Sequence, residues 1–137
     1  MAERVADLKV LKREQRQAWD DNAAGWKKWW PVFERAAQVV SDRLVALAQL
    51  KPGERVLDLA TGSGEPAVTV ARCVGPTGRV VAVDQSPGML AVARERVAAL
   101  GLGNLEFVES DAESLALPPA TFDAIVCRWG FMFLPDL

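Results

Sequence analysis

A glycine-rich stretch behind a short apolar run constrains the fold of this chain more than any other feature. The run Arg55–Leu59 is typical of a buried strand, and Gly62 and Gly64 lie in the tight turn that follows it. Glu65 and Pro66 are predicted to begin a helix, because proline is favoured at the first helical position. Glycines in such a turn let a ligand approach the backbone, and a helix N-terminus offers free N–H groups. The stretch therefore predicts a nucleotide-type pocket.

The charges around this turn indicate which ligand it favours. The glycine spacing matches the dinucleotide fingerprint, and Asp84 ends the next predicted strand, where such proteins hold a ribose. Between residues 58 and 71, however, Asp58 and Glu65 are the only charged side chains. Like charges about 4 Å apart repel by about 4 kcal/mol at a protein surface, so a pyrophosphate is disfavoured. S-adenosylmethionine fits better, because it carries a sulfonium and an ammonium group and no phosphate.

The expected cofactor site extends beyond the turn to the ends of later strands. Asp84 is expected to accept both ribose hydroxyls, and Asp111 to accept from the adenine amino group while the Ala112 backbone meets the ring. Gln85 and Met89 are expected to flank the purine. A loop cap is the alternative role for Asp111, and an ordinary core position is the alternative for Met89. The full expected set is Trp19, Trp26, Asp58, Ala60, Thr61, Gly62, Ser63, Gly64, Asp84, Gln85, Met89, Asp111, Ala112 and Arg128.

Hydrophobic periodicity predicts a regular alternation of elements. Helices are expected over residues 5–19, over a short segment that ends before Pro31, and over 32–50. Behind them, strands at 55–59, 79–84, 105–108 and 122–127 alternate with helices at 65–74 and 87–100. The fold class is then α/β, a partial Rossmann-like parallel sheet of order 3-2-1-4 with helices on both faces. Residues 1–50 form a helical lid segment of this single domain, and residues 51–137 form its cofactor-binding part.

Tryptophans concentrate before the glycine-rich turn, with four of the five between Trp19 and Trp30. An aromatic ring face attracts a cation by about 0.5 to 2 kcal/mol. Trp19 and Trp26 are therefore expected to form a lid over the methyl donor, whereas Trp29 and Trp30 are expected to pack the helices on the sheet.

Composition favours one globular domain over a nucleic-acid-binding or membrane protein. Half of the 137 residues are hydrophobic, a quarter are charged, and the net charge is −2. No block of like charge occurs, and residues 1–12 lack a signal-peptide core. With no histidine and two distant cysteines, Cys73 and Cys127, no zinc-binding spacing is present. A cytoplasmic protein with reduced thiols and no metal is expected.

Four segments, in this order, resemble the motifs of class I S-adenosylmethionine-dependent methyltransferases. They are Asp58–Gly64, Val83–Leu90, Ser110–Glu113 and Phe122–Arg128, and they are most similar to the ubiquinone and menaquinone C-methyltransferase branch. Ala60 stands where the family has its first motif glycine. The resemblance implies methyl transfer to a small-molecule acceptor, with the segment from Trp19 to Trp26 folded over the cofactor. Because that methyl group is already activated, no obligate catalytic residue can be named. Arg128, at the carboxyl end of the fourth predicted strand, could hold an acidic acceptor or face solvent.

Two other functions stay open on the sequence alone. A nicotinamide-dependent oxidoreductase is disfavoured by the acidic turn, and a non-catalytic cofactor-binding or interaction fragment is favoured by the end of the chain at Leu137. Related enzymes usually continue through three more strands. Strand 122–127 would then be an apolar edge, followed by Trp129 and Phe131, that invites pairing. We expect either self-association through this edge or a longer parent enzyme.

Overall fold

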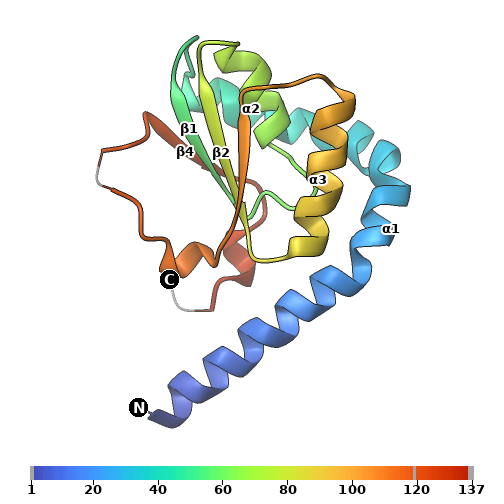
Figure 1. Ribbon diagram of the computed structural model, residues 1–137, viewed down its shortest axis with the longest axis vertical. Coiled ribbons are helices and arrows are strands. Elements are labelled where there is room, and N and C mark those ends of the chain that lie inside the picture. Colours follow the sequence, from blue (N-terminus) through green and yellow to red (C-terminus); the bar gives the residue numbers. More distant parts are fainter. Residues whose placement is uncertain (1, 119, 136–137) are drawn as a thin grey trace.

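Four parallel strands form the centre of the computed structural model, which describes residues 2–118 and 120–135 (Figure 1). The elements are α1 (Ala2–Ala48), β1 (Arg55–Leu59), α2 (Ala67–Val74), β2 (Arg79–Asp84), α3 (Pro87–Ala99), β3 (Leu105–Glu109), η1 (Ala112–Ser114), β4 (Ala124–Cys127) and η2 (Phe131–Phe133). The strand order β3-β2-β1-β4 confirms the prediction. Among the described helices, none combines the length and the apolar character needed to cross a membrane.

The centre of the sheet is buried on both faces, as expected for continuous apolar strands in a parallel sheet. On one face, Val56, Val80 and Ala82 pack against α2. On the other face, Leu57 and Val83 form a second cluster, which partly buried side chains from the segment between β3 and β4 cover. Alternate strand residues thus supply the two clusters.

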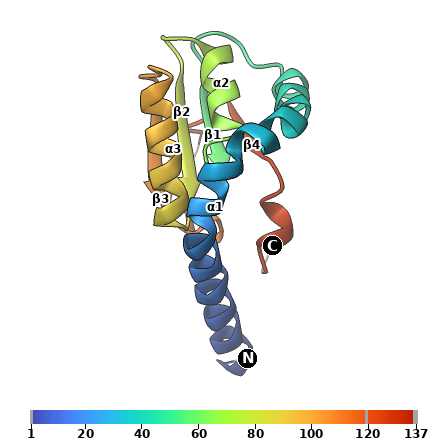
Figure 2. The same ribbon diagram turned by 90° about the vertical axis from the view of Figure 1, so that its right-hand side faces the viewer.

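The three α-helices lie on one face of the sheet, in front of it in Figure 2. Helices had been expected on both faces. Consecutive right-handed crossovers that step in one direction, from β1 to β2 to β3, place α2 and α3 on the same side. Within the described residues, the connection from β3 to β4 holds only the short helix η1.

A single helix, α1, replaces the three helices predicted for the N-terminal segment. It runs for 47 residues with Pro31 inside, although an interior proline removes one hydrogen bond and normally kinks or ends a helix. The helix changes direction along its course (Figure 1) and contacts α3, α2 and β4. Tertiary contacts therefore hold the chain helical on both sides of the proline. Its N-terminal part projects beyond the sheet.

Strand and helix bounds otherwise follow the prediction closely. β3 extends to Glu109, and β4 begins at Ala124 rather than Phe122. α3 begins at Pro87 behind the N-cap Ser86, whose hydroxyl accepts from the Met89 N–H. α2 begins at Ala67, so the predicted start at residue 65 is wrong, because the turn extends through residue 66.

Candidate functional site

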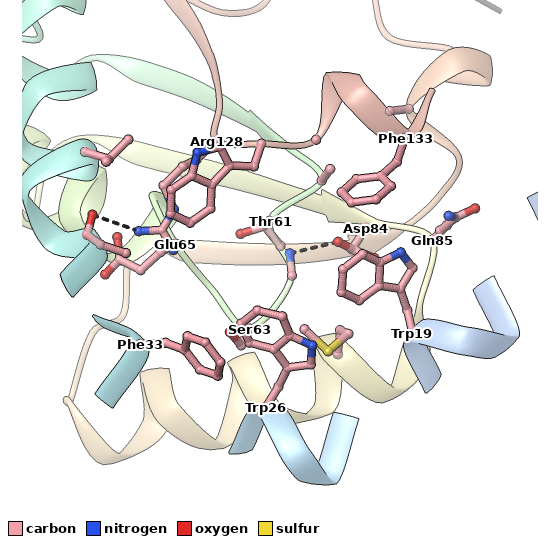
Figure 3. Close-up of a pocket in the computed structure, with 18 of the residues that line it drawn as sticks. Trp19, Trp26, Phe33, Thr61, Ser63, Glu65, Asp84, Gln85, Arg128 and Phe133 are labelled. Carbon is pink, nitrogen blue, oxygen red and sulfur yellow. Dashed lines mark hydrogen bonds between the residues drawn. The ribbon is translucent and has the colours of Figure 1, made fainter. Parts of the chain in front are cut away.

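A cavity of about 320 Å³ lies where the carboxyl ends of the strands face the middle of α1 (Figure 3). All of the expected site residues line it except Asp58 and Gly64. The cavity wall also contains residues outside the expected cofactor-binding set. They are Trp30, Phe33, Glu34, Ala36, Ala37, Val40, Glu65, Ser110, Trp129, Gly130, Phe133 and Leu134. Aromatic and small apolar side chains make up most of the wall.

The glycine-rich turn forms the floor of the cavity. Gly62 has φ +56° and Gly64 has φ +104°, the left-handed region that glycine adopts without a steric cost. A Cβ on Gly64 would lie 3.4 Å from the Ala93 Cβ, so this turn packs directly on α3. Ala60, at the position where the resembled family has glycine, also takes a positive φ of 54° and lines the cavity.

Asp84 is fixed across this turn at the end of β2. One carboxylate oxygen accepts from the Gly62 N–H at 2.8 Å, and the other accepts from the Ser86 N–H at 2.9 Å. Burial raises the pKa of Asp84, and these backbone donors oppose that effect. Each oxygen keeps a lone pair, so a ligand with two neighbouring hydroxyls could donate to both.

Asp58 lies beneath the turn rather than in the cavity wall. Its side chain is 0% exposed, and one oxygen accepts from the Ala67 N–H at 3.1 Å. The other oxygen is also buried. Burial raises the pKa of Asp58 to about 8, while the buried Thr61 side chain and the Ala67 N–H act to lower it. Of the two acidic residues in the turn, Glu65 is the one that lines the cavity.

Arg128 does not face solvent. Its guanidinium donates to Glu34 at 3.0 Å and to the Ser41 hydroxyl at 2.8 Å, both on α1. Its own side chain is 9% exposed. Because Arg128 is already paired, a free cation for an acidic acceptor is not present at this position.

Asp111 takes the alternative role of a loop cap and also stands in the cavity wall, and its contact with adenine stays a prediction. It lines the cavity, and it also caps η1, since one carboxylate oxygen accepts from the Glu113 N–H at 3.0 Å. The other oxygen pairs with Lys12 at 2.6 Å. Burial acts to raise the pKa of Asp111, but the bonds from Lys12 and Glu113 outweigh it and lower that pKa. Lys12 contributes from the projecting part of α1.

The tryptophans of α1 form an aromatic wall above the turn. Trp19 meets Phe133 edge to face at 5.3 Å between ring centroids, and Trp26 stacks at a tilt on Phe33 at 4.8 Å. Trp30 also lines the cavity, so the expectation that it simply packs the helices on the sheet is wrong. Trp29 is 52% exposed, so the same expectation is wrong for Trp29.

A sequence signal for the missed residues does exist. Residues 26, 30, 33, 37 and 40 recur at the spacing of one helix face, and all five line the cavity. Pro31 divides this pattern in the sequence, because proline usually ends a helix.

Acidic residues outnumber basic ones in the cavity lining, with Glu34, Glu65, Asp84 and Asp111 against Arg128. Three of these acids are in ion pairs, since Glu34 pairs with Arg128, Glu65 with Arg96 and Asp111 with Lys12. Of the four, Asp84 is the one with no ion pair among the described residues. Outside any site, Cys73 and Cys127 are free thiols. No group of three or more potential metal ligands occurs in residues 2–118 and 120–135.

Comparisons with known proteins agree with this geometry. Residues 56–137 match the methyltransferase domain family. The ubiquinone/menaquinone biosynthesis C-methyltransferase UbiE of Ectopseudomonas oleovorans is 44% identical over 87 residues, which cover 63% of this chain and 51% of that protein. A SAM dependent methyltransferase from Aquifex aeolicus superposes with a TM-score of 0.64 at 33% identity, over 70% of this chain and 51% of that one. TrmN from Thermus thermophilus superposes with a TM-score of 0.61 at 40% identity, over 65% of this chain and 27% of that one.

The match covers most of this chain but only part of each relative. The chain spans about half the length of the first two proteins and about a quarter of the third. The family match itself covers more than half of the chain, from the first buried residue of β1 onward. On that match, the chain belongs to the methyltransferase domain family.

Proposed function

We propose that this chain binds S-adenosylmethionine and forms the cofactor-binding part of an enzyme that transfers its methyl group to a small-molecule acceptor. The observation that carries the proposal is the Asp84 carboxylate in the cavity wall, which two backbone N–H groups fix in position to accept from the hydroxyls of a ligand. The similarity to a C-methyltransferase favours a carbon atom as the methyl acceptor.

The residues present fit this cofactor. Asp84 would hold the ribose hydroxyls, and Asp111 with the Ala112 backbone would meet the adenine. A direct contact with Asp58 stays a prediction from the sequence.

Bound S-adenosylmethionine supplies an activated methyl group, so the protein mainly has to orient the reactants and exclude water. Orientation of the reactants can lower the activation barrier by roughly 7 kcal/mol or more. Trp19 and Trp26 border the cavity in Figure 3, and Trp30 also lines it, so these rings would exclude water from the bound cofactor. Residues 1–50 would then serve as the lid segment and residues 51–137 as the binding part. A cytoplasmic location stays a prediction from the sequence.

Calorimetric titration with S-adenosylhomocysteine and with NAD tests the proposal. We expect binding of the first compound and none of the second. Asp84→Ala should abolish binding, because it removes both hydroxyl acceptors, while Asp7→Ala, on an exposed part of α1, should not change it. Binding of NAD alone would support the oxidoreductase, and binding of neither compound would support a non-catalytic interaction fragment. Unchanged affinity in Asp84→Ala would show that the site has been misplaced.

A further inference from the structure

The outer face of α1, on the side turned away from the sheet, is both apolar and basic. Because α1 lies in front of the sheet in Figure 2, this side faces outward. We propose that the outer face binds the surface of an anionic lipid bilayer. Its residues recur at the spacing of one helix side and are all exposed: Lys28, Trp29, Val32, Arg35, Val39 and Arg43. The inference concerns a surface outside the cofactor cavity and does not depend on the proposed function.

The apolar side chains of the outer face are largely open to solvent. Trp29 is 52% exposed, Val32 is 55% exposed and Val39 is 68% exposed. The opposite side of the same helix is also apolar and supplies Trp30 and Ala37 to the cavity wall. A helix that is apolar on two sides is expected to be covered on both of them. The sheet covers one side, and the other side has the apolar surface of a docking site.

The charges of the outer face select an anionic partner. Lys28, Arg35 and Arg43 form no ion pair within residues 2–118 and 120–135. In the stretch 28–43, all of which the structure describes, the one exposed acid is Asp42, which accepts from Gln38. If two copies of the chain paired through their outer faces, three cations of each copy would meet three of the other. Like charges at an interface are costly, so a second copy is disfavoured as the partner.

Basic and apolar residues alternate along the outer face in the way that a lipid surface requires. Arg35 lies between Val32 and Val39, where its apolar stem can lie beside both while the guanidinium reaches outward. In a bilayer, the phosphates of the headgroups attract such cations, and the acyl boundary below them takes up apolar side chains. A nucleic acid would supply the phosphates without the apolar boundary.

A groove of about 360 Å³ continues the apolar surface toward the N-terminus. Trp29 forms one wall, and Trp19, Trp26 and Phe33 form others. A Cβ added to Gly25, which also lines the groove, would have no neighbour within 4 Å. The groove is therefore open, and its rings offer an apolar seat for part of an acyl chain. Tryptophan is also the residue that membrane–water interfaces favour.

Co-sedimentation with vesicles tests the inference. The wild-type protein should bind vesicles made of phosphatidylglycerol and phosphatidylcholine in equal parts. It should bind vesicles of phosphatidylcholine alone about tenfold more weakly or less, because three cations of the outer face then lose their counter-charges. Raised salt should weaken binding to the mixed vesicles. Asp84→Ala should bind the vesicles as the wild type does, since the cofactor cavity takes no part.

Two substitutions test the two components of the outer face separately. Arg35→Gln should weaken binding to the mixed vesicles about fivefold, the effect of one basic residue near a charged membrane. Val39→Gln should weaken it by about the same factor, because less apolar area is buried. The matched controls are Arg72→Gln on α2 and Leu100→Gln behind α3, which change exposed residues outside the outer face. Each control should change the affinity by less than about twofold.

Four results would overturn the inference. The outer face is no site for anionic lipid if the protein binds neither kind of vesicle, or binds both equally well. A loss of binding in Arg35→Gln without a loss in Val39→Gln would indicate a general polyanion site. Equal losses in the outer-face variants and in the controls would place the contact elsewhere. Circular dichroism checks the fold of each variant, and all four substituted side chains are exposed.

Discussion

Burial makes the first acidic residue of the glycine-rich turn unlike an ordinary carboxylate. Asp58 is enclosed at the end of β1, and the loss of hydration raises its pKa from an ordinary 3.8 to about 8. The folded protein therefore holds a proton on Asp58 at pH values where the unfolded chain has released it. Between about pH 4 and pH 8 this residue lowers the free energy of unfolding as the pH rises.

Asp58→Asn should remove this fall in the free energy of unfolding at higher pH, because the amide does not ionise. The free energy of unfolding of the variant should exceed the wild-type value by an amount that grows from pH 5 to pH 8 and reaches the order of a few kcal/mol. Urea unfolding at several pH values measures it, with Asp7→Asn as an exposed control. A difference that does not change with pH would show that Asp58 ionises normally in the folded state.

At the scale of elements, polar contacts fasten α1 over the ends of the strands. Lys12 pairs with Asp111 and Glu113, and Arg16 pairs with Glu109 at 2.5 Å. Further along the helix, Asp20 accepts from the Ser86 hydroxyl and from the Gly88 N–H at the start of α3. The aromatic wall is placed by these contacts as well as by apolar packing.

Asp20→Ala should loosen α1 from α3, because the Ser86 hydroxyl and the Gly88 N–H both lose their acceptor. We expect a loss of about 1 to 3 kcal/mol in the free energy of unfolding, and faster amide exchange around residues 19–30. Asp21→Ala is the matched control, since Asp21 is exposed and accepts from Gln17 on the same helix. Equal effects of the two variants would mean that Asp20 does not fasten the helix.

At the scale of the whole molecule, the sheet ends in an apolar edge. β4 is an edge strand, and Ile125 on it is 61% exposed. Trp129, Phe131 and Met132 continue the exposed apolar surface beyond it, each at least half exposed. Such an edge offers unpaired backbone groups and apolar side chains to another strand.

We predict that the chain self-associates through this edge. Sedimentation velocity should show a mean mass that rises with concentration, and Ile125→Lys should weaken the association about tenfold or more, because a charge replaces a buried apolar contact. Val39→Lys changes an equally exposed apolar residue of α1 and should have no such effect. A monomer at every concentration, or the same weakening in both variants, would contradict the prediction.

Local sequence was sufficient for the sheet and for much of the cavity floor. Continuous apolar runs predicted the four strands, and alternation with helices predicted their order, because chain handedness leaves few other arrangements. Glycines at 62 and 64 and acids at 84 and 111 lie at strand ends, and parallel strands bring such ends together at one edge.

Only the tertiary structure determined the course of α1, the burial of the acids in the turn and the ion pairs of the site. It kept α1 helical through Pro31, and so placed Trp30, Phe33 and Glu34 in the cavity wall. It buried the side chains of both Asp58 and Glu65, and of these two acids it brought a basic partner to Glu65, although the two are equivalent as acids in the sequence. It also paired Arg128 and Arg96 with carboxylates far from them in the chain. Hydrophobic period and turn chemistry act between neighbours in the sequence, whereas burial and ion pairing depend on which segments the fold brings into contact.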